Sequence, residues 1–82
     1  MLRITELEAG DGRSLRVEGR LAGPWVDELR RVCERHRARA LDLRGLQTVD
    51  LEGLTLLRQL ARDGIALERL SGFVAALMAE PP

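Results

Sequence analysis

Apolar and polar residues alternate in two runs near the start of the chain. Leu2 and Ile4 alternate with charged or hydroxyl-bearing neighbours, and Leu15 and Val17 do the same further along. Alternation with a period of two is typical of a strand that buries one face. Because Gly10-Asp11-Gly12 between the two runs favours a turn, the pattern predicts an opening β-hairpin.

After a predicted loop over residues 19–23, the spacing of the apolar residues changes to that of a helix. Pro24 suits a first helical turn, where its missing N–H costs nothing. The helix should run to about Arg37 and carry one apolar stripe. The stripe consists of Trp25, Val26, Leu29, Val32, Cys33 and His36. We expect both aromatic residues of the chain, Trp25 and Phe73, to pack in the core.

The second half of the chain alternates strands with helices. Residues 40–43 and 65–70 are short apolar runs, and each is a predicted strand. Between them, a loop leads to Asp50, which begins a helix that should end at Gly64. A last short helix should open at Ser71-Gly72. The apolar faces of these helices contain Leu54, Leu57, Leu60 and Ala61 in the first and Phe73, Val74, Leu77 and Met78 in the second.

The predicted order of elements is ββαβαβα. This order is typical of an α/β fold, here a small mixed sheet of about four strands covered by three helices. The opening hairpin is followed by βαβα crossovers. Eighty-two residues leave room for one core, so residues 1–82 should form a single domain. Because so small a core is marginally stable, we expect a homodimer that buries an uncovered sheet edge or helix face.

Charge and composition narrow the range of functions. Thirteen basic and thirteen acidic residues cancel, so the chain lacks the basic field of a nucleic-acid-binding protein. No run approaches the roughly 18 apolar residues of a membrane span, and the start does not resemble a signal peptide. We therefore expect a cytoplasmic protein that neither binds nucleic acid nor spans a membrane. One cysteine, one histidine and scattered glycines offer no metal cluster or nucleotide motif, so we expect no metal or cofactor.

The residues that could carry a reaction are few. Asp42 and Asp50, near the ends of predicted elements, could bind magnesium or accept a phosphoryl group, and His36 could act as a base or bind a metal ion. For each we favour a structural interpretation, with Asp50 as a helix cap and His36 half-buried at a helix C-terminus. Cys33 should be a small core residue. We therefore expect no catalytic residue.

The run from Ala40 to Leu54, ALDLRGLQTVDLEGL, resembles the signature of STAS domains. These domains are shared by sulfate transporters and anti-sigma factor antagonists. Their signature is a hydrophobic strand containing Asp, a short loop, and then Asp, two small residues, Gly and a hydrophobic residue. The residues that match it are Asp42, Asp50, Gly53 and Leu54.

The resemblance implies a non-catalytic protein-interaction module in bacterial signalling, similar to an anti-sigma factor antagonist. Its partner would be an anti-sigma factor, a kinase or a sensor. In such antagonists a kinase phosphorylates the serine just before the glycine, and that position is Glu52 here. Because neither Glu52 nor Leu51 has a hydroxyl group, the family's serine switch cannot operate at these positions. Glu52 has one negative charge against about 1.5 to 2 for phosphoserine, so it mimics the phosphorylated state only in part.

The partner-binding residues implied by the resemblance surround this degenerate phosphorylation position. They are Thr48, Asp50, Leu51, Glu52, Gly53 and Leu54. Glu52 also has a purely structural interpretation, because an anion near a helix N-terminus stabilises the helix by about 0.3–1 kcal/mol. An alternative function stays open, in which the chain is an accessory STAS subunit of an ABC-type membrane transporter and binds its ATPase. A third, an enzyme or phosphoacceptor using Asp42, Asp50 or His36, has the least support.

Overall fold

The opening alternation forms the two strands of the predicted hairpin. The computed structural model describes residues 1–7 and 13–80. In it, β1 (Leu2–Leu7) pairs antiparallel with β2 (Ser14–Leu21), so that Ile4 lies opposite Val17. The predicted turn, Gly10-Asp11-Gly12, lies outside the described residues.

Three helices and three further strands follow β2. They are α1 (Pro24–His36), β3 (Ala40–Asp42), β4 (Leu46–Val49), α2 (Leu51–Arg62), β5 (Ala66–Glu68) and α3 (Gly72–Ala79). The helix ends agree with the signals in the sequence. Pro24 opens α1, Asp50 caps α2, and Gly64 follows the end of α2 with a left-handed φ of 97°. The α/β class and the three helices are therefore confirmed.

The central strand β2 organises a mixed, five-stranded sheet. On one side it pairs antiparallel with β1. On the other side it pairs parallel with β3 along its first half and with β4 near its end. β5 pairs parallel with β3 and forms the far edge. The sheet has one strand more than the predicted number of about four, and this additional strand is β4.

Two segments predicted as loops belong to this sheet. β2 continues to Leu21, and β4 lies inside the predicted loop between residues 43 and 50. The physical reason is a bulge, because the register between β2 and β4 shifts between Gly19 and Arg20. Gly19 has a φ of 99°, and a Cβ atom there would lie 2.5 Å from the carbonyl oxygen of Met1. This glycine therefore marks an irregularity within a strand and not the end of one.

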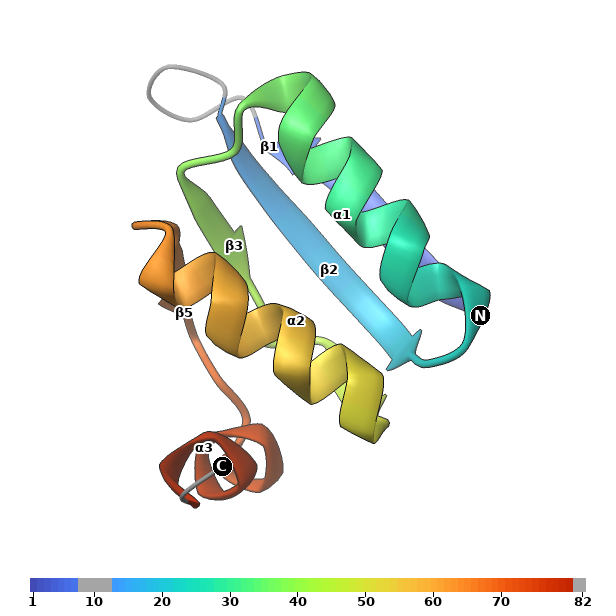
Figure 1. The fold of residues 1–82 in the computed structure, drawn as a ribbon, viewed down its shortest axis with the longest axis vertical. Coiled ribbons are helices and arrows are strands. Elements are labelled where there is room, and N and C mark those ends of the chain that lie inside the picture. Colours follow the sequence, from blue (N-terminus) through green and yellow to red (C-terminus); the bar gives the residue numbers. More distant parts are fainter. Residues whose placement is uncertain (8–12, 81–82) are drawn as a thin grey trace.

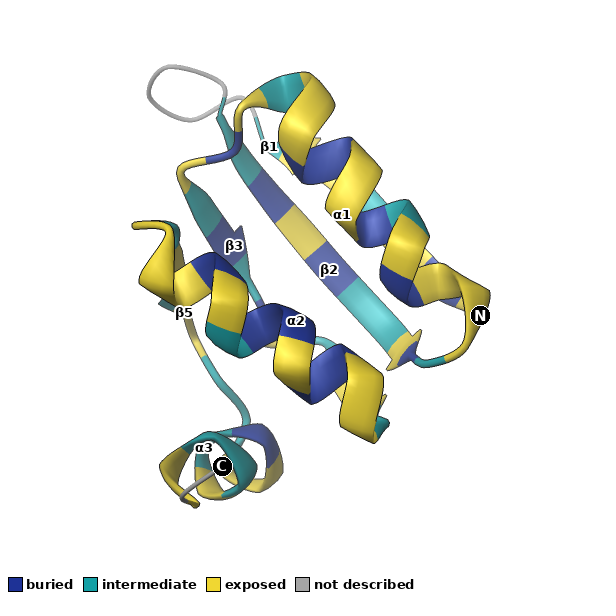
Figure 2. Ribbon diagram, viewed as in Figure 1, coloured by how far each residue is buried: buried dark blue, intermediate teal, exposed yellow. Residues whose placement is uncertain are grey.

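Helices α1 and α2 lie next to each other on one face of the sheet (Figure 1). Their buried residues face the strands, and their exposed residues form the outer surface (Figure 2). α3 packs against α2 and β4 at one end of the molecule (Figure 1). The largest fully buried side chains are Leu15, Leu21, Leu29, Leu41, Leu43, Leu46, Leu57, Val17 and Val74.

The prediction that both aromatic side chains pack in the core is wrong. Trp25 is 37% exposed and Phe73 is 55% exposed. Trp25 lies in the first turn of α1 and lines a groove between this helix and β1, so part of its side chain meets solvent. In α3 the buried residue is Val74, and consecutive residues of a helix point about 100° apart, so Phe73 turns toward solvent.

Candidate functional site

Asp50 fixes the start of α2 and connects it to the start of α1. Its Oδ1 atom accepts a hydrogen bond from the N–H of Gly53 at 2.7 Å, which is the predicted cap. Its Oδ2 atom accepts a second bond, at 3.1 Å, from the N–H of Gly23, the residue before α1. Because both carboxylate oxygens bind backbone N–H groups, Asp50 has a structural role that links the two helix starts.

Two further residues of the predicted site are buried. Gly53 faces the sheet, and a Cβ atom there would lie 2.8 Å from the carbonyl oxygen of Leu21. Leu54 is 8% exposed. The glycine therefore allows α2 to approach β2 closely, and Leu54 adds to the buried surface. Neither side-chain position faces solvent, so both act on the site through the placement of the helix.

The remaining predicted residues face outward at the start of α2. Leu51 is 79% exposed, an unusual position for a large apolar side chain. Glu52 is its exposed neighbour in the first turn, where the helix dipole favours a negative charge. Thr48, on β4, is also exposed. The structure thus brings an apolar side chain and a carboxylate together on the surface in the first turn of α2.

Leu51 and Glu52 line a groove between α1 and α2 with a volume of about 480 Å³. The α1 side of the groove is formed by Val26, Asp27 and Arg30, and the α2 side also contains Thr55, Leu56 and Gln59. Asp27 and Arg30 form an ion pair with each other. Within residues 1–7 and 13–80, the Glu52 carboxylate has neither an ion-pair nor a hydrogen-bond partner. Its charge therefore remains available to a bound molecule.

The α1 side of this groove was absent from the predicted site. Val26 was recognised as part of the apolar stripe, but nothing in the sequence indicated that it lies beside Leu51. The Gly23–Asp50 hydrogen bond brings these helix starts together, and it joins residues 27 positions apart. A contact of that range leaves no local signal in the sequence.

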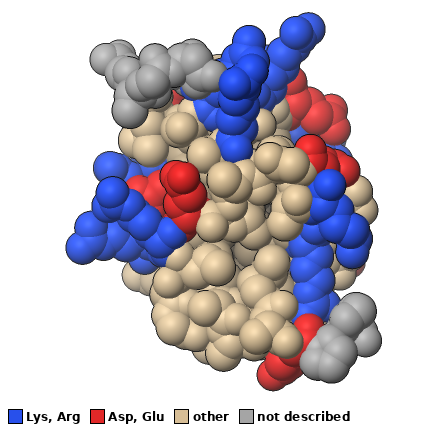
Figure 3. Space-filling model, turned by 90° about the vertical axis from the view of Figure 1, so that its left-hand side faces the viewer, with Lys and Arg blue, Asp and Glu red and all other residues tan. Residues whose placement is uncertain are grey.

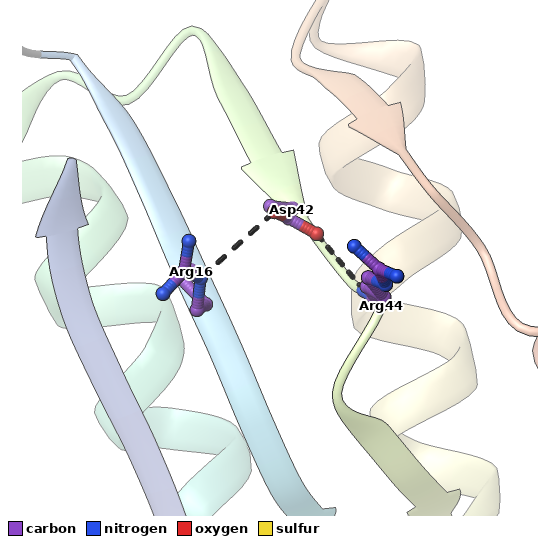
Figure 4. A network of polar contacts seen from close by, with 3 residues as sticks. All are labelled: Arg16, Asp42 and Arg44. Atoms are coloured by element: carbon purple, nitrogen blue, oxygen red, sulfur yellow. Dashed lines mark hydrogen bonds and ion pairs between the residues drawn. The ribbon is translucent and has the colours of Figure 1, made fainter. Parts of the chain in front are cut away.

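Asp42 lies on the sheet face opposite α1 and α2, between two arginines (Figure 4). One of its oxygens accepts a 3.0 Å hydrogen bond from the backbone N–H of Arg44, and the other lies 3.9 Å from Nε of Arg16. Its side chain is 13% exposed. These contacts hold the turn after β3 in place. In the described part of the chain, no three His, Cys, Asp or Glu side chains are arranged to hold a metal ion.

His36 and Cys33 occupy the places expected of structural residues at the end of α1. His36 is half-buried, and its Nδ1 atom lies 2.6 Å from a carboxylate oxygen of Glu6 on β1. Cys33 is 4% exposed. Burial raises the pKa of the Cys33 thiol to about 11, and the negative charge of Glu34 adds to the effect. At neutral pH the thiol stays protonated, and a protonated thiol is a poor nucleophile.

Comparison with known proteins found no matching family model and no matching curated protein. None of the helices in residues 1–7 and 13–80 combines the length and apolar character needed to cross a membrane.

Proposed function

We propose that this protein is a non-catalytic STAS-type interaction module of bacterial signalling in the cytoplasm. It binds a regulatory protein, such as an anti-sigma factor, a kinase or a sensor, at the start of α2. The observation that supports the proposal is that the signature residues fall into a structural group and an exposed group. Asp50 and Gly53 hold the backbone, while Leu51 and Glu52 stand free on the surface beside a groove.

The exposed pair defines the partner surface that would fit. Leu51 needs an apolar depression that removes its side chain from water, which stabilises the complex by about 1.5–3 kcal/mol when burial is complete. Glu52 needs an arginine or lysine, because its carboxylate has no partner within the described residues. A protein surface with an apolar pocket beside a basic residue would satisfy both.

The position of Glu52 makes the interaction constitutive. In an antagonist of the switched kind, the charge at this position appears and disappears as the serine is phosphorylated and dephosphorylated. Glu52 has a carboxylate that no kinase adds or removes, and it offers fewer hydrogen-bond acceptors than a phosphate. The surface presented to the partner therefore does not change by phosphorylation at this position. The amount of complex depends on the concentrations of the two proteins.

Two substitutions in the exposed pair test the proposal. The regulatory kinases, anti-sigma factors and sensors of the host are titrated by calorimetry against the wild type, Leu51→Ala and Glu52→Gln. We expect about a tenfold loss of affinity for each variant, which corresponds to about 1.4 kcal/mol. Glu68→Gln, an exposed glutamate on β5, is the matched control and should bind as the wild type does. Equal affinities for all four proteins would contradict the proposal.

Glu52→Ser tests the link to the phosphorylation switch separately. If α2 presents this position as a switched antagonist does, the partner kinase with ATP should add one phosphoryl group to the variant and none to the wild type. Intact mass spectrometry measures the addition. A variant that binds the kinase but stays unmodified would show that the position is out of register with the family's switch.

A further inference from the structure

α1 separates the groove beside α2 from a second groove on its other side. The second groove, about 320 Å³ in volume, lies between α1 and the edge strand β1. Its floor includes Leu2 and Ile4 from β1 and Val32 from α1, and its rim includes Trp25 and Glu28. None of these residues belongs to the surface proposed above.

The outer edge of β1 carries unpaired backbone groups. The Met1 carbonyl accepts a hydrogen bond from the N–H of Arg20 on β2 at 3.0 Å. In an antiparallel pair, successive residues direct their N–H and C=O groups alternately toward and away from the partner strand. The groups of Leu2, Ile4 and Glu6 therefore point away from β2. Within the described residues β1 pairs with β2 alone, so this edge is open to an added strand.

The two ends of the groove differ in charge. At one end, Glu6 is already bound to His36, and Arg35 adds a positive charge. At the other end, Glu28 has no ion-pair or hydrogen-bond partner among residues 1–7 and 13–80, and the half-exposed ring of Trp25 lies one helical turn away. A carboxylate beside an indole ring attracts a cation through its charge and through the cation–π interaction. This end of the groove is complementary to an arginine or lysine side chain.

We propose that the groove between α1 and β1 binds an extended segment of a partner protein as an additional antiparallel strand. The segment places an apolar side chain opposite Ile4 and a basic side chain opposite Leu2, next to Trp25 and Glu28. Backbone hydrogen bonds to Leu2, Ile4 and Glu6 hold it in register. This is a second binding surface, which does not depend on the function proposed for the start of α2.

Charge favours a foreign segment over a second copy of this chain. Suppose that β1 of another copy added antiparallel and formed hydrogen bonds to Leu2, Ile4 and Glu6. The two Ile4 residues would then lie opposite each other. Glu6 of that copy would then lie opposite Leu2, beside the unpaired Glu28, and two like charges would meet. An arginine at the same place turns this repulsion into attraction.

The sole tryptophan of the chain provides a direct measurement of binding. The probe is the peptide acetyl-Thr-Ser-Thr-Val-Thr-Arg-Thr-amide, whose valine and arginine occupy the positions opposite Ile4 and Leu2. Titration should shift the emission of Trp25 to shorter wavelength in a saturable manner. Absence of a saturable shift would overturn the proposal. So would a shift that appears on raising the protein concentration without peptide, because a second copy would then fill the groove.

A charge swap tests the contact with Glu28. Glu28→Arg should weaken binding of the arginine peptide at least tenfold, and the same peptide with glutamate in place of arginine should bind this variant and not the wild type. Glu34→Arg, on an exposed part of the same helix, is the matched control and should bind like the wild type. Leu51→Ala should also leave peptide affinity unchanged. If Glu34→Arg or Leu51→Ala weakens binding as much as Glu28→Arg, the groove assignment is wrong.

Amide exchange tests the added strand itself. On saturation with peptide, the N–H groups of Leu2, Ile4 and Glu6 should exchange at least tenfold more slowly, because they gain hydrogen bonds. Those of Arg3, Thr5 and Leu7 already face β2 and should change little. Equal slowing of both sets, or of neither, would refute strand addition.

Discussion

The start of α2 contains residues that hold the backbone in place and residues that stay exposed. Asp50 was predicted as the cap of α2, and the structure confirms it. Its second bond, to the N–H of Gly23, had no counterpart in the prediction, because it joins residues that become neighbours only in the fold. Leu51 and Glu52, between the cap and the buried Gly53, are left exposed by the geometry of the first helical turn.

Cys33 should give the protein a distinct stability profile at alkaline pH. The pKa of this thiol is about 11 in the folded chain, against 9.0 for an ordinary cysteine, mainly because of burial. Since burial favours the neutral thiol, its contribution is complete below about pH 9. It is lost as the pH rises toward about 11, by at most about 1.4 kcal/mol per pH unit.

Urea unfolding between about pH 8 and about pH 11 measures this loss. The chain contains no tyrosine, and all its basic residues are arginine, so Cys33 is its one side chain that ionises in this range. Cys33→Ala should therefore show a nearly flat profile over the same interval. A decline of equal size in the variant would assign the pH dependence to another cause.

At the level of helices and strands, short sequence patterns predicted most elements. They did not predict β4 or the last residues of β2. The bounds of α1 and α2 follow from Pro24, Asp50 and Gly64, whose backbone preferences act within one turn. The position of β4 does not follow from such local signals. Its four residues form a strand because they pair with β2, which has a bulge at Gly19. Strand pairing of this kind is a long-range contact, and the sequence of the segment alone favoured a loop.

The close contact of α2 with β2 predicts opposite outcomes for two helical glycines. Gly53→Ala would place a methyl group 2.8 Å from the Leu21 carbonyl oxygen, so we expect a loss of about 1–3 kcal/mol in the free energy of unfolding. Gly72→Ala, in α3, would meet no atom within 4 Å, and alanine favours helix more than glycine does. Its stability should stay the same or rise by up to about 1 kcal/mol. Urea unfolding compares the two, and equal effects would contradict the steric argument.

At the scale of the whole molecule, the surface near α3 contains few charged residues. The sequence of α3, GFVAALMA, contains no charged residue, and Val74 is its buried side chain. Figure 3, which views the molecule from the side of β5, shows uncharged residues gathered in the centre of this face and charged ones around them. Phe73 of α3 is 55% exposed, and an exposed apolar side chain on an uncharged surface favours association with another protein surface. Because the net charge is zero, no net electrostatic repulsion opposes the approach of two copies at this face.

We therefore expect the protein to form a dimer whose population rises with concentration, with α3 at the interface. Phe73→Glu should shift the equilibrium toward monomer, because it places a charge in the buried contact. Leu51→Glu introduces the same charge at an exposed leucine elsewhere and should leave the equilibrium unchanged. Sedimentation velocity over a wide concentration range gives the populations. A wild-type chain that stays monomeric throughout would rule out this interface.

The chain's local chemistry was enough to specify the two opening strands, the three helices, the Asp50 cap of α2 and the exposed charge at position 52. Each of these depends on backbone preferences and periodicity within a few residues, which are written directly in the sequence. Tertiary packing alone placed Val26 and Arg30 beside Leu51 and brought Trp25 and Glu28 to the edge of β1. It also moved both aromatic rings out of the core. Both grooves form between elements distant along the chain, and only the folded arrangement brings their walls together.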